Sequence, residues 1–220
     1  VMVAAYVFIL ERQRLHISWV RIALLTALHM VWINTQGLFA LGVVITGIYC
    51  VEATIEWVIR RDGQQARPRR RMVAMWTTLG VLAIAGLANP YGWRGALFPL
   101  RLFARIEPEQ ANVFSLNVSE NTPLLHLLST EPRSVYGVVL LALLCLAAFA
   151  LRIRSLRPAH VLLFAAFLYL AYSAQRNILL FMFMAAPIAG HYLSGWLADR
   201  SEAYGPSGRL RYGVLAVVAI

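Results

Sequence analysis

The sequence predicts an all-α fold, a polytopic bundle of helices that crosses a membrane several times. Hydrophobic residues make up 60% of the 220 residues and charged residues only 14%, which is more apolar than a soluble domain of this size tolerates. The apolar residues are collected into long runs that short arginine-rich links separate. A run of about 20 apolar residues is long enough to cross the hydrocarbon core as a helix.

Six apolar stretches are long enough, with their flanking residues, to form full spans. They cover roughly 16–33, 37–59, 72–88, 135–151, 159–174 and 177–197, with a partial span at each end, at 1–10 and from 212 onward. We therefore expect one transmembrane domain over 1–220. Because the sequence begins and ends inside apolar stretches, we expect it to be a fragment of a longer protein.

The arginines give the expected orientation of these spans. They occupy every second link, at Arg12 and Arg14, at Arg60, Arg61, Arg67, Arg69, Arg70 and Arg71, at Arg152, Arg154 and Arg157, and at Arg200, Arg209 and Arg211. Basic links of a membrane protein face the cytoplasm. The loops at 34–37, 89–134 and 174–177 are therefore expected outside a bacterial cytoplasmic (inner) membrane.

The basic excess points to lipid as a partner. The formal net charge is +10, and all 20 basic residues are arginine. These arginines lie in short links between apolar runs and do not form one face of a soluble domain. We therefore expect anionic lipid head groups as the partner and no nucleic acid.

The loop at 89–134 is the one large loop on the expected outer side, and it carries arginines against the orientation bias. On a helix, Arg94, Arg101 and Arg105 project within one narrow sector. We expect a short interfacial helix at 99–106 that carries Arg101 and Arg105 one turn apart. These arginines either hold phospholipid phosphates or bind the phosphate of a lipid-linked substrate, because the guanidinium fork matches phosphate oxygens.

Two other segments on the expected outer side carry polar residues for which the sequence predicts a local structure. Arg176 lies at the outer end of a span, and Asn177 is placed to cap the next helix, whose N-terminus favours an anion. "NPYG", starting at Asn89, is a turn sequence.

Inside the spans the notable polar residues are Glu52 and Glu56, one turn apart. We expect Glu56 to reach water beside Arg60, and Glu52 to form a buried pair or a proton site. Cys50 and Cys145 lie in apolar runs and predict no disulfide, and the scattered histidines predict no metal site.

Four motifs carry a resemblance to a known group. They are "WINTQGLFALG" at 32–42, "NPYGWR" at 89–94, "VSENTP" at 118–123 and "QRNILLFMFMAAP" at 175–187. In this order they resemble bacterial polytopic proteins similar to the GT-C glycosyltransferases, which use polyprenyl-phosphate sugars and include protein mannosyltransferase-like and aminoarabinose transferase-like members. The resemblance implies a lipid-linked sugar as donor, no further cofactor, and transfer to an acceptor on the outer face.

The resemblance extends to single residues. Asn34 and Gly37 match an Asn-x-His-Gly pattern of the group, with Gln36 in place of the histidine, and Glu120 with Pro123 matches a Glu-x-x-Pro element. The catalytic acid of the group lies in an outside loop that this sequence does not include, so no catalytic residue is assigned. Neither the need for a divalent metal nor the oligomeric state follows from the sequence.

The sequence thus predicts a membrane glycosyltransferase, or a fragment of one. Its expected substrate-binding residues are Asn34, Gln36, Arg94, Arg101, Arg105, Glu120, Arg176 and Asn177. Two alternatives stay open. One is a transporter or flippase of a polar or lipid-linked solute, with Glu52 as the coupling group. The other is a non-catalytic membrane scaffold whose arginines only anchor it.

Overall fold

A computed structural model describes residues 2–59, 66–99, 101 and 119–203, and every regular element within these ranges is helical. The all-α prediction is confirmed for this part of the chain. The chain divides into two compact units, Val1–Ser115 and Leu116–Ile220, and each is described by itself. The expectation of one transmembrane domain stays a prediction.

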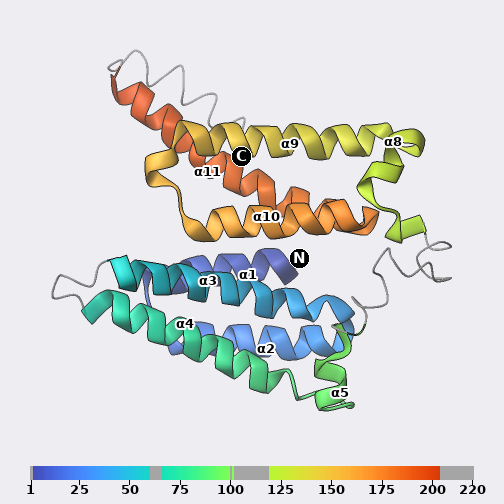
Figure 1. The fold of residues 1–220 in the computed structure, drawn as a ribbon. Coiled ribbons are helices and arrows are strands. Elements are labelled where there is room, and N and C mark those ends of the chain that lie inside the picture. The colour runs from blue at the N-terminus through green and yellow to red at the C-terminus, as the bar shows by residue number, and fades with distance from the viewer. Residues whose placement is uncertain (1, 60–65, 100, 102–118, 204–220) are drawn as a thin grey trace. The chain divides into compact units, whose positions relative to one another are not determined.

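The first unit contains four long helices. They are α1 (Met2–Leu15), α2 (Trp19–Thr35), α3 (Ala40–Ile59) and α4 (Ala66–Ala85). Helix α1 packs against α2 and α3, and α4 packs against the same two helices, which closes a four-helix bundle (Figure 1). A short 3-10 helix, η1 (Gly37–Phe39), joins α2 to α3, and a single helical turn, α5 (Trp93–Ala96), follows α4.

The core of the first unit depends on one close approach between α1 and α3. The Tyr6 ring is fully buried and lies so near Gly42 that a Cβ on that glycine would come within 2.8 Å of the ring. Trp32 packs edge-on against Tyr6, with ring centroids 5.4 Å apart. A side chain larger than hydrogen at position 42 would therefore push α1 away from α3.

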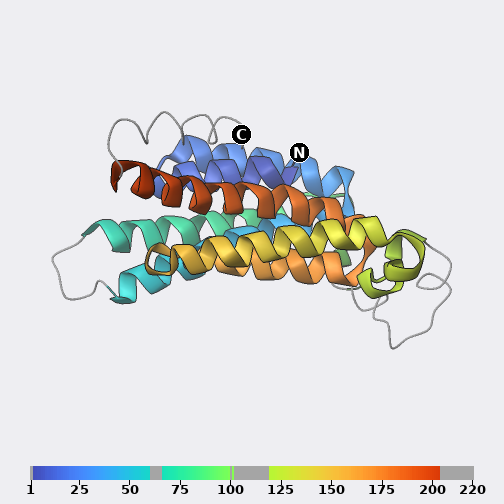
Figure 2. The same ribbon diagram turned by 90° about the horizontal axis from the view of Figure 1, so that it is seen from above.

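The second unit holds three long helices and several short turns. In chain order these are η2 (Ser119–Asn121), η3 (Leu124–His126), α8 (Leu127–Thr130), α9 (Pro132–Leu151), η4 (Ile153–Ser155), α10 (Pro158–Ser173), η5 (Gln175–Asn177) and α11 (Ile178–Ala203). Helix α11 packs against both α9 and α10 (Figure 2). Pro132 and Pro158 stand in the first turns of their helices, where a missing N–H costs nothing.

Three helical segments of the described chain are long and apolar enough to cross a membrane. They are Gly37–Ile59, Pro132–Leu151 and Gln175–Arg200, and they coincide with three of the six predicted spans. The apolar helix at Pro158–Ser173 is shorter. Helix α2 has only 17 residues, and α4 includes Arg67, Arg69, Arg70 and Arg71. The full count of six spans stays a prediction.

Helix α4 begins earlier than the apolar pattern indicates. The predicted span starts at 72, whereas the helix starts at Ala66. Arginine is a good helix former, so hydropathy marks where a span becomes apolar and does not mark where its helix begins. The first turns of α4 therefore present Arg67, Arg69 and Arg70 as exposed side chains.

A network of four charged side chains joins α1, α3 and α4 in the first unit. Glu52 is fully buried, and its Oε2 lies 2.7 Å from Nη2 of Arg71 and 3.5 Å from Nε of Arg14. Glu56 pairs with the same two arginines. The prediction of a buried pair for Glu52 is confirmed. The expected partner of Glu56, Arg60, lies outside the described residues, and the structure gives Glu56 these partners instead.

Neutralising Glu52 should destabilise the protein more than neutralising Glu56. Glu52→Gln leaves the buried Arg71 without its fully buried carboxylate partner, and breaking a buried pair costs about 3–5 kcal/mol. Glu56 is one quarter exposed, so water compensates part of the loss in Glu56→Gln. Unfolding in detergent micelles measures both variants. Equal losses, or a larger loss in Glu56→Gln, would contradict this account of the network.

Candidate functional site

The segment after α4 is a tight turn that Asn89 organises. Its Nδ2 donates to the carbonyl oxygens of Gly86 and Gly92, at 3.0 and 2.9 Å. Its Oδ1 accepts from the backbone N–H of Tyr91 at 2.8 Å. Gly92 has a positive φ of 52°, a conformation that glycine adopts without strain. The turn predicted from "NPYG" is confirmed.

Gly95 allows this turn to fold back on α5. A Cβ at position 95 would overlap the side-chain amide of Asn89, with both its Oδ1 and its Nδ2 inside van der Waals contact. The side chain of Asn89 can therefore make its three hydrogen bonds only because position 95 has no side chain. In the sequence "NPYGWRG", the first residue, Asn89, therefore packs against the last, Gly95.

Two of the predicted arginines flank a single tryptophan. The guanidinium carbon of Arg94 lies 5.6 Å from the ring centroid of Trp93, and that of Arg101 lies 5.9 Å from it. All three side chains are exposed. Cation–π contact of this kind restrains an arginine and leaves its N–H groups free to donate. The arrangement brings two positive charges close to one tryptophan ring.

A pocket of about 620 Å³ lies between the end of α2 and this turn. Its lining residues are Ile33, Asn34, Thr35, Gln36, Gly37, Phe39, Asn89, Pro90, Tyr91, Arg94, Gly95, Phe98 and Arg101. Four of the eight predicted site residues, from 34 to 101, therefore line one pocket. The sequence did not predict its aromatic part, because Phe39 and Phe98 read as ordinary apolar residues.

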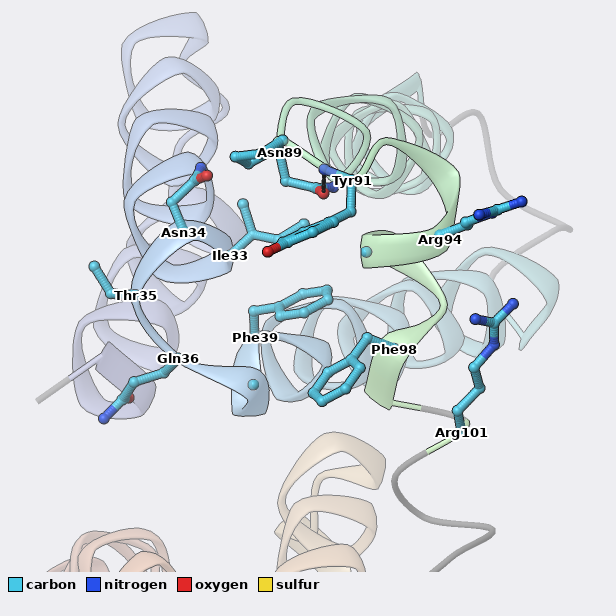
Figure 3. Close-up of a pocket in the computed structure, with 13 residues that line it drawn as sticks. Ile33, Asn34, Thr35, Gln36, Phe39, Asn89, Tyr91, Arg94, Phe98 and Arg101 are labelled. Atoms are coloured by element: carbon cyan, nitrogen blue, oxygen red, sulfur yellow. Dashed lines mark hydrogen bonds between the residues drawn. The ribbon is translucent and has the colours of Figure 1, made fainter.

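The polar groups stand on opposite sides of this pocket. Figure 3 shows Asn34 and Gln36 on the α2 side, and Arg94 and Arg101 together on the other side with their guanidinium groups turned outward. The rings of Phe39 and Phe98 lie between the two sides. A ligand that meets both the amides and the arginines must therefore extend across an aromatic surface.

Asn34 also holds the pocket together. Its Nδ2 donates to the carbonyl oxygens of Met30 and Ala88, at 2.7 and 3.2 Å, which ties the last turn of α2 to the segment after α4. Its side chain remains exposed, so its Oδ1 can accept from a ligand. Gln36 is exposed as well, and its side chain makes no hydrogen bond to any part of the chain that the structure describes.

Two further residues that were predicted to bind substrate lie on neighbouring short helices of the second unit. Glu120 lies in η2 and Arg176 in η5, both exposed. The backbone N–H of Gln175 donates to the Thr122 carbonyl at 2.9 Å, and its Nε2 donates to Oε2 of Glu131 at 3.2 Å. Residues 119–123 and 173–177 thus lie side by side, with Glu120 and Arg176 exposed.

The side chain of Asn177 contacts the end of the helix before it. It is buried, and its Nδ2 donates to the Leu170 carbonyl at 3.0 Å. That carbonyl also accepts from the backbone N–H of Ala174 at 3.2 Å, so the amide adds a second hydrogen bond at the end of α10. Asn177 belongs to η5 and directly precedes α11, which starts at Ile178. A cap made by its Oδ1, and an anion at this helix end, stay predictions.

Arg105 and most of the interfacial helix expected at 99–106 lie outside the described residues. Arg101 is the described part, and its backbone N–H donates to the Leu97 carbonyl at 3.3 Å, which is the hydrogen bond of a helical turn. Among the residues that the structure places, no three His, Cys, Asp or Glu side chains come together as a candidate metal site.

Comparison with known proteins finds no family model that matches this chain, no similar curated protein and no matching solved structure. The likeness to GT-C enzymes therefore rests on the four short motifs alone.

Two glycine substitutions should have opposite effects on stability. Gly95→Ala forces the Asn89 side chain out of its turn, so we expect a lower melting temperature. On α3, a Cβ added to Gly47 would meet no atom within 4 Å, so Gly47→Ala should gain up to about 1 kcal/mol of helix propensity. Thermal unfolding in detergent compares them. If Gly95→Ala unfolds at or above the temperature of Gly47→Ala, the proposed fit at position 95 is wrong.

Proposed function

We propose that this protein is a membrane glycosyltransferase, or part of one, that binds a lipid-linked sugar phosphate at the predicted outer end of its first unit. The observation that carries the proposal is the pocket itself. It is lined by three amide side chains, three aromatic rings and two arginines. Few ligands have groups that match amides, aromatic rings and arginines together. A polyprenyl-phosphate sugar has hydroxyl groups for the amides, a sugar ring for the aromatic rings and a phosphate for the arginines.

The arginines are suited to the phosphate. A guanidinium group keeps its charge at any physiological pH and donates paired hydrogen bonds to phosphate oxygens. Trp93 restrains both groups, so less conformational entropy is lost when they bind. Both groups turn outward from the pocket, so a phosphate bound to them would lie near the proposed membrane surface, where a lipid carrier has its phosphate.

The amides and rings are suited to the sugar. The Oδ1 of Asn34 offers an acceptor for a hydroxyl group, and Gln36 offers both donors and an acceptor. The rings of Tyr91 and Phe98 offer apolar faces for the C–H groups of a sugar ring. The volume of about 620 Å³ falls in the usual range for a small-molecule pocket. In this arrangement the sugar lies against the rings and its phosphate reaches the arginine side.

The reaction would be transfer of the sugar to an acceptor hydroxyl. A bond forms between the acceptor oxygen and the anomeric carbon, the bond from that carbon to the phosphate oxygen breaks, and the carrier phosphate leaves with the electron pair. The hydroxyl proton passes to a base, for which no residue is assigned here. Arg94 and Arg101 would stabilise the charge on the leaving phosphate.

The transporter alternative finds less support in the arrangement of Glu52. A coupling carboxylate must change its protonation or its partners during transport, and Glu52 is held by Arg71 at 2.7 Å in a fully buried position. Such a pair favours a fixed structural role. The scaffold alternative predicts that the pocket binds no specific ligand, and the following experiment distinguishes it.

The membrane topology belongs to the same proposal. We propose six full spans with partial spans at both ends in a bacterial inner membrane, with residues 34–37, 89–134 and 174–177 outside. The separation of the exposed Arg67, Arg69 and Arg70 at the start of α4 from the pocket beyond its end supports this orientation.

Removing either arginine should weaken binding of a short-chain polyprenyl-phosphate sugar by about 10- to 150-fold, because a charged hydrogen bond contributes about 1.5–3 kcal/mol. The variants are Arg94→Ala and Arg101→Ala in neutral-lipid nanodiscs, with Arg69→Ala and Arg70→Ala at the start of α4 as controls. The salt dependence of binding should also fall in the pocket variants.

Two results would count against the proposal. Wild-type affinity in Arg94→Ala and Arg101→Ala would show that these arginines serve bulk lipid only. Equal affinity of the wild type for the uncharged polyprenol would show that the phosphate is not recognised at all.

A further inference from the structure

A histidine in the core of the first unit has one nitrogen with a partner and one without. His29 on α2 is fully buried, and its Nδ1 shares a hydrogen bond of 2.8 Å with the Tyr6 hydroxyl. Its Nε2 is buried and has no hydrogen-bond partner in the described part of the chain. An unpaired buried nitrogen of this kind costs about 1–3 kcal/mol unless something binds it.

Gly86 lies beside this nitrogen, just after the end of α4. A Cβ placed on Gly86 would lie 3.8 Å from Nε2 of His29, and 3.1 and 3.4 Å from the carbonyl oxygens of Ala83 and Leu82 in its own preceding turn. A methyl group at position 86 would therefore lie against both Nε2 and the Ala83 oxygen, whereas glycine leaves this position without a side chain. Apolar cavities stay dry, but a site with several polar partners holds water.

One of these carbonyl groups also needs a partner. At the end of α4 the N–H of Gly86 donates to Leu82, and the N–H of Leu87 donates to Ile84. These two bonds use the amides that would otherwise reach the Ala83 oxygen. Ala83 therefore offers one of the carbonyl groups that a helix end leaves without a helical partner, and its oxygen lies 3.1 Å from the same Cβ position on Gly86.

We infer that Gly86, His29 and the Ala83 carbonyl form a binding site for a single buried water molecule. Water suits the site because it donates to the carbonyl oxygen and can either donate to Nε2 or accept from it. Either tautomer of His29 that the Tyr6 hydroxyl selects is then satisfied. A metal ion would need more ligands, and no such group gathers among the described residues.

This site connects the helix core to the wall of the pocket. Asn89, which organises the turn, donates to the Gly86 carbonyl at 3.0 Å. Phe39, which lines the pocket, lies edge-on to His29 with ring centroids 6.0 Å apart. The water joins α2 to the end of α4 directly behind these two residues. His29 is accordingly a positioning residue for the pocket wall and does not touch its ligand.

The inference goes beyond the proposed function, and it can be tested without any ligand of the pocket. The test variant is Gly86→Ala, whose methyl group displaces the water. The matched control is Gly80→Ala on the same helix, where a Cβ would meet no atom within 4 Å. A map of the wild-type protein that resolves other buried waters should show density within about 3.2 Å of Nε2 of His29.

Two further measurements use the same pair of variants. Gly86→Ala should lower the melting temperature by about 2–4 °C, the shift expected for loss of one buried hydrogen-bonded site in a protein of this size, whereas Gly80→Ala should leave it unchanged or raise it. The 15N resonance of Nε2 of His29 should move in Gly86→Ala and stay in place in Gly80→Ala.

The inference fails if the map shows no density beside Nε2. It also fails if the Nε2 resonance is the same in Gly86→Ala and in the wild type. Neither outcome bears on whether the pocket binds a sugar phosphate, because both are read on the unliganded protein.

Discussion

The pairing of Arg71 with Glu52 is the interaction on which the first unit depends most. Both side chains are buried, with 2.7 Å between nitrogen and oxygen, and a charge without a partner in such a place would cost several kcal/mol. The pair fixes α4 against α3, and Arg14 extends the contact to α1. Since the two helices are rigid rods, fixing them at one end also determines where the other end of α4 lies.

That other end carries the pocket. From Arg71, α4 continues to Ala85, about 21 Å further along its axis at 1.5 Å a residue. The chain then turns at Asn89, and the hydrogen bond from Asn34 to the Ala88 carbonyl joins this turn to the end of α2. A charged contact at one end of the bundle and an amide-linked turn at the other end thus fix where the pocket lies, at the end with the turn. The helices carry the apolar side chains that separate the two.

The sequence predicted the parts of this arrangement that depend on local chemistry. Apolar runs indicated the helices, "NPYG" indicated the turn, and the depth of Glu52 in its span indicated a buried pair. It did not predict contacts between distant segments. The aromatic part of the pocket combines Phe39 and Phe98, which are 59 residues apart in the chain. Nothing in either neighbourhood indicates that the two line one pocket.

The eight predicted site residues also separate in a way that the sequence did not indicate. Asn34, Gln36, Arg94 and Arg101 line one pocket in the first unit, while Glu120 and Arg176 lie on neighbouring short helices of the second. The side chain of Asn177 binds the end of the helix before it, since an asparagine between two helices can donate to the carbonyl groups before it as well as accept from the amides after it. Only the packed structure shows this contact.

The central claim is that the pocket opens on the outer side of the membrane, opposite the arginines at the start of α4. Two variants with one added cysteine each, Gln36→Cys and Arg69→Cys, test it most directly. They are placed in sealed vesicles of known orientation and labelled with a maleimide that does not cross the bilayer. Both positions are exposed, and the natural Cys50 and Cys145 are buried. We expect Gln36→Cys to be labelled only from the outer side and Arg69→Cys only from the cytoplasmic side. Labelling of both from the same side would contradict the claim.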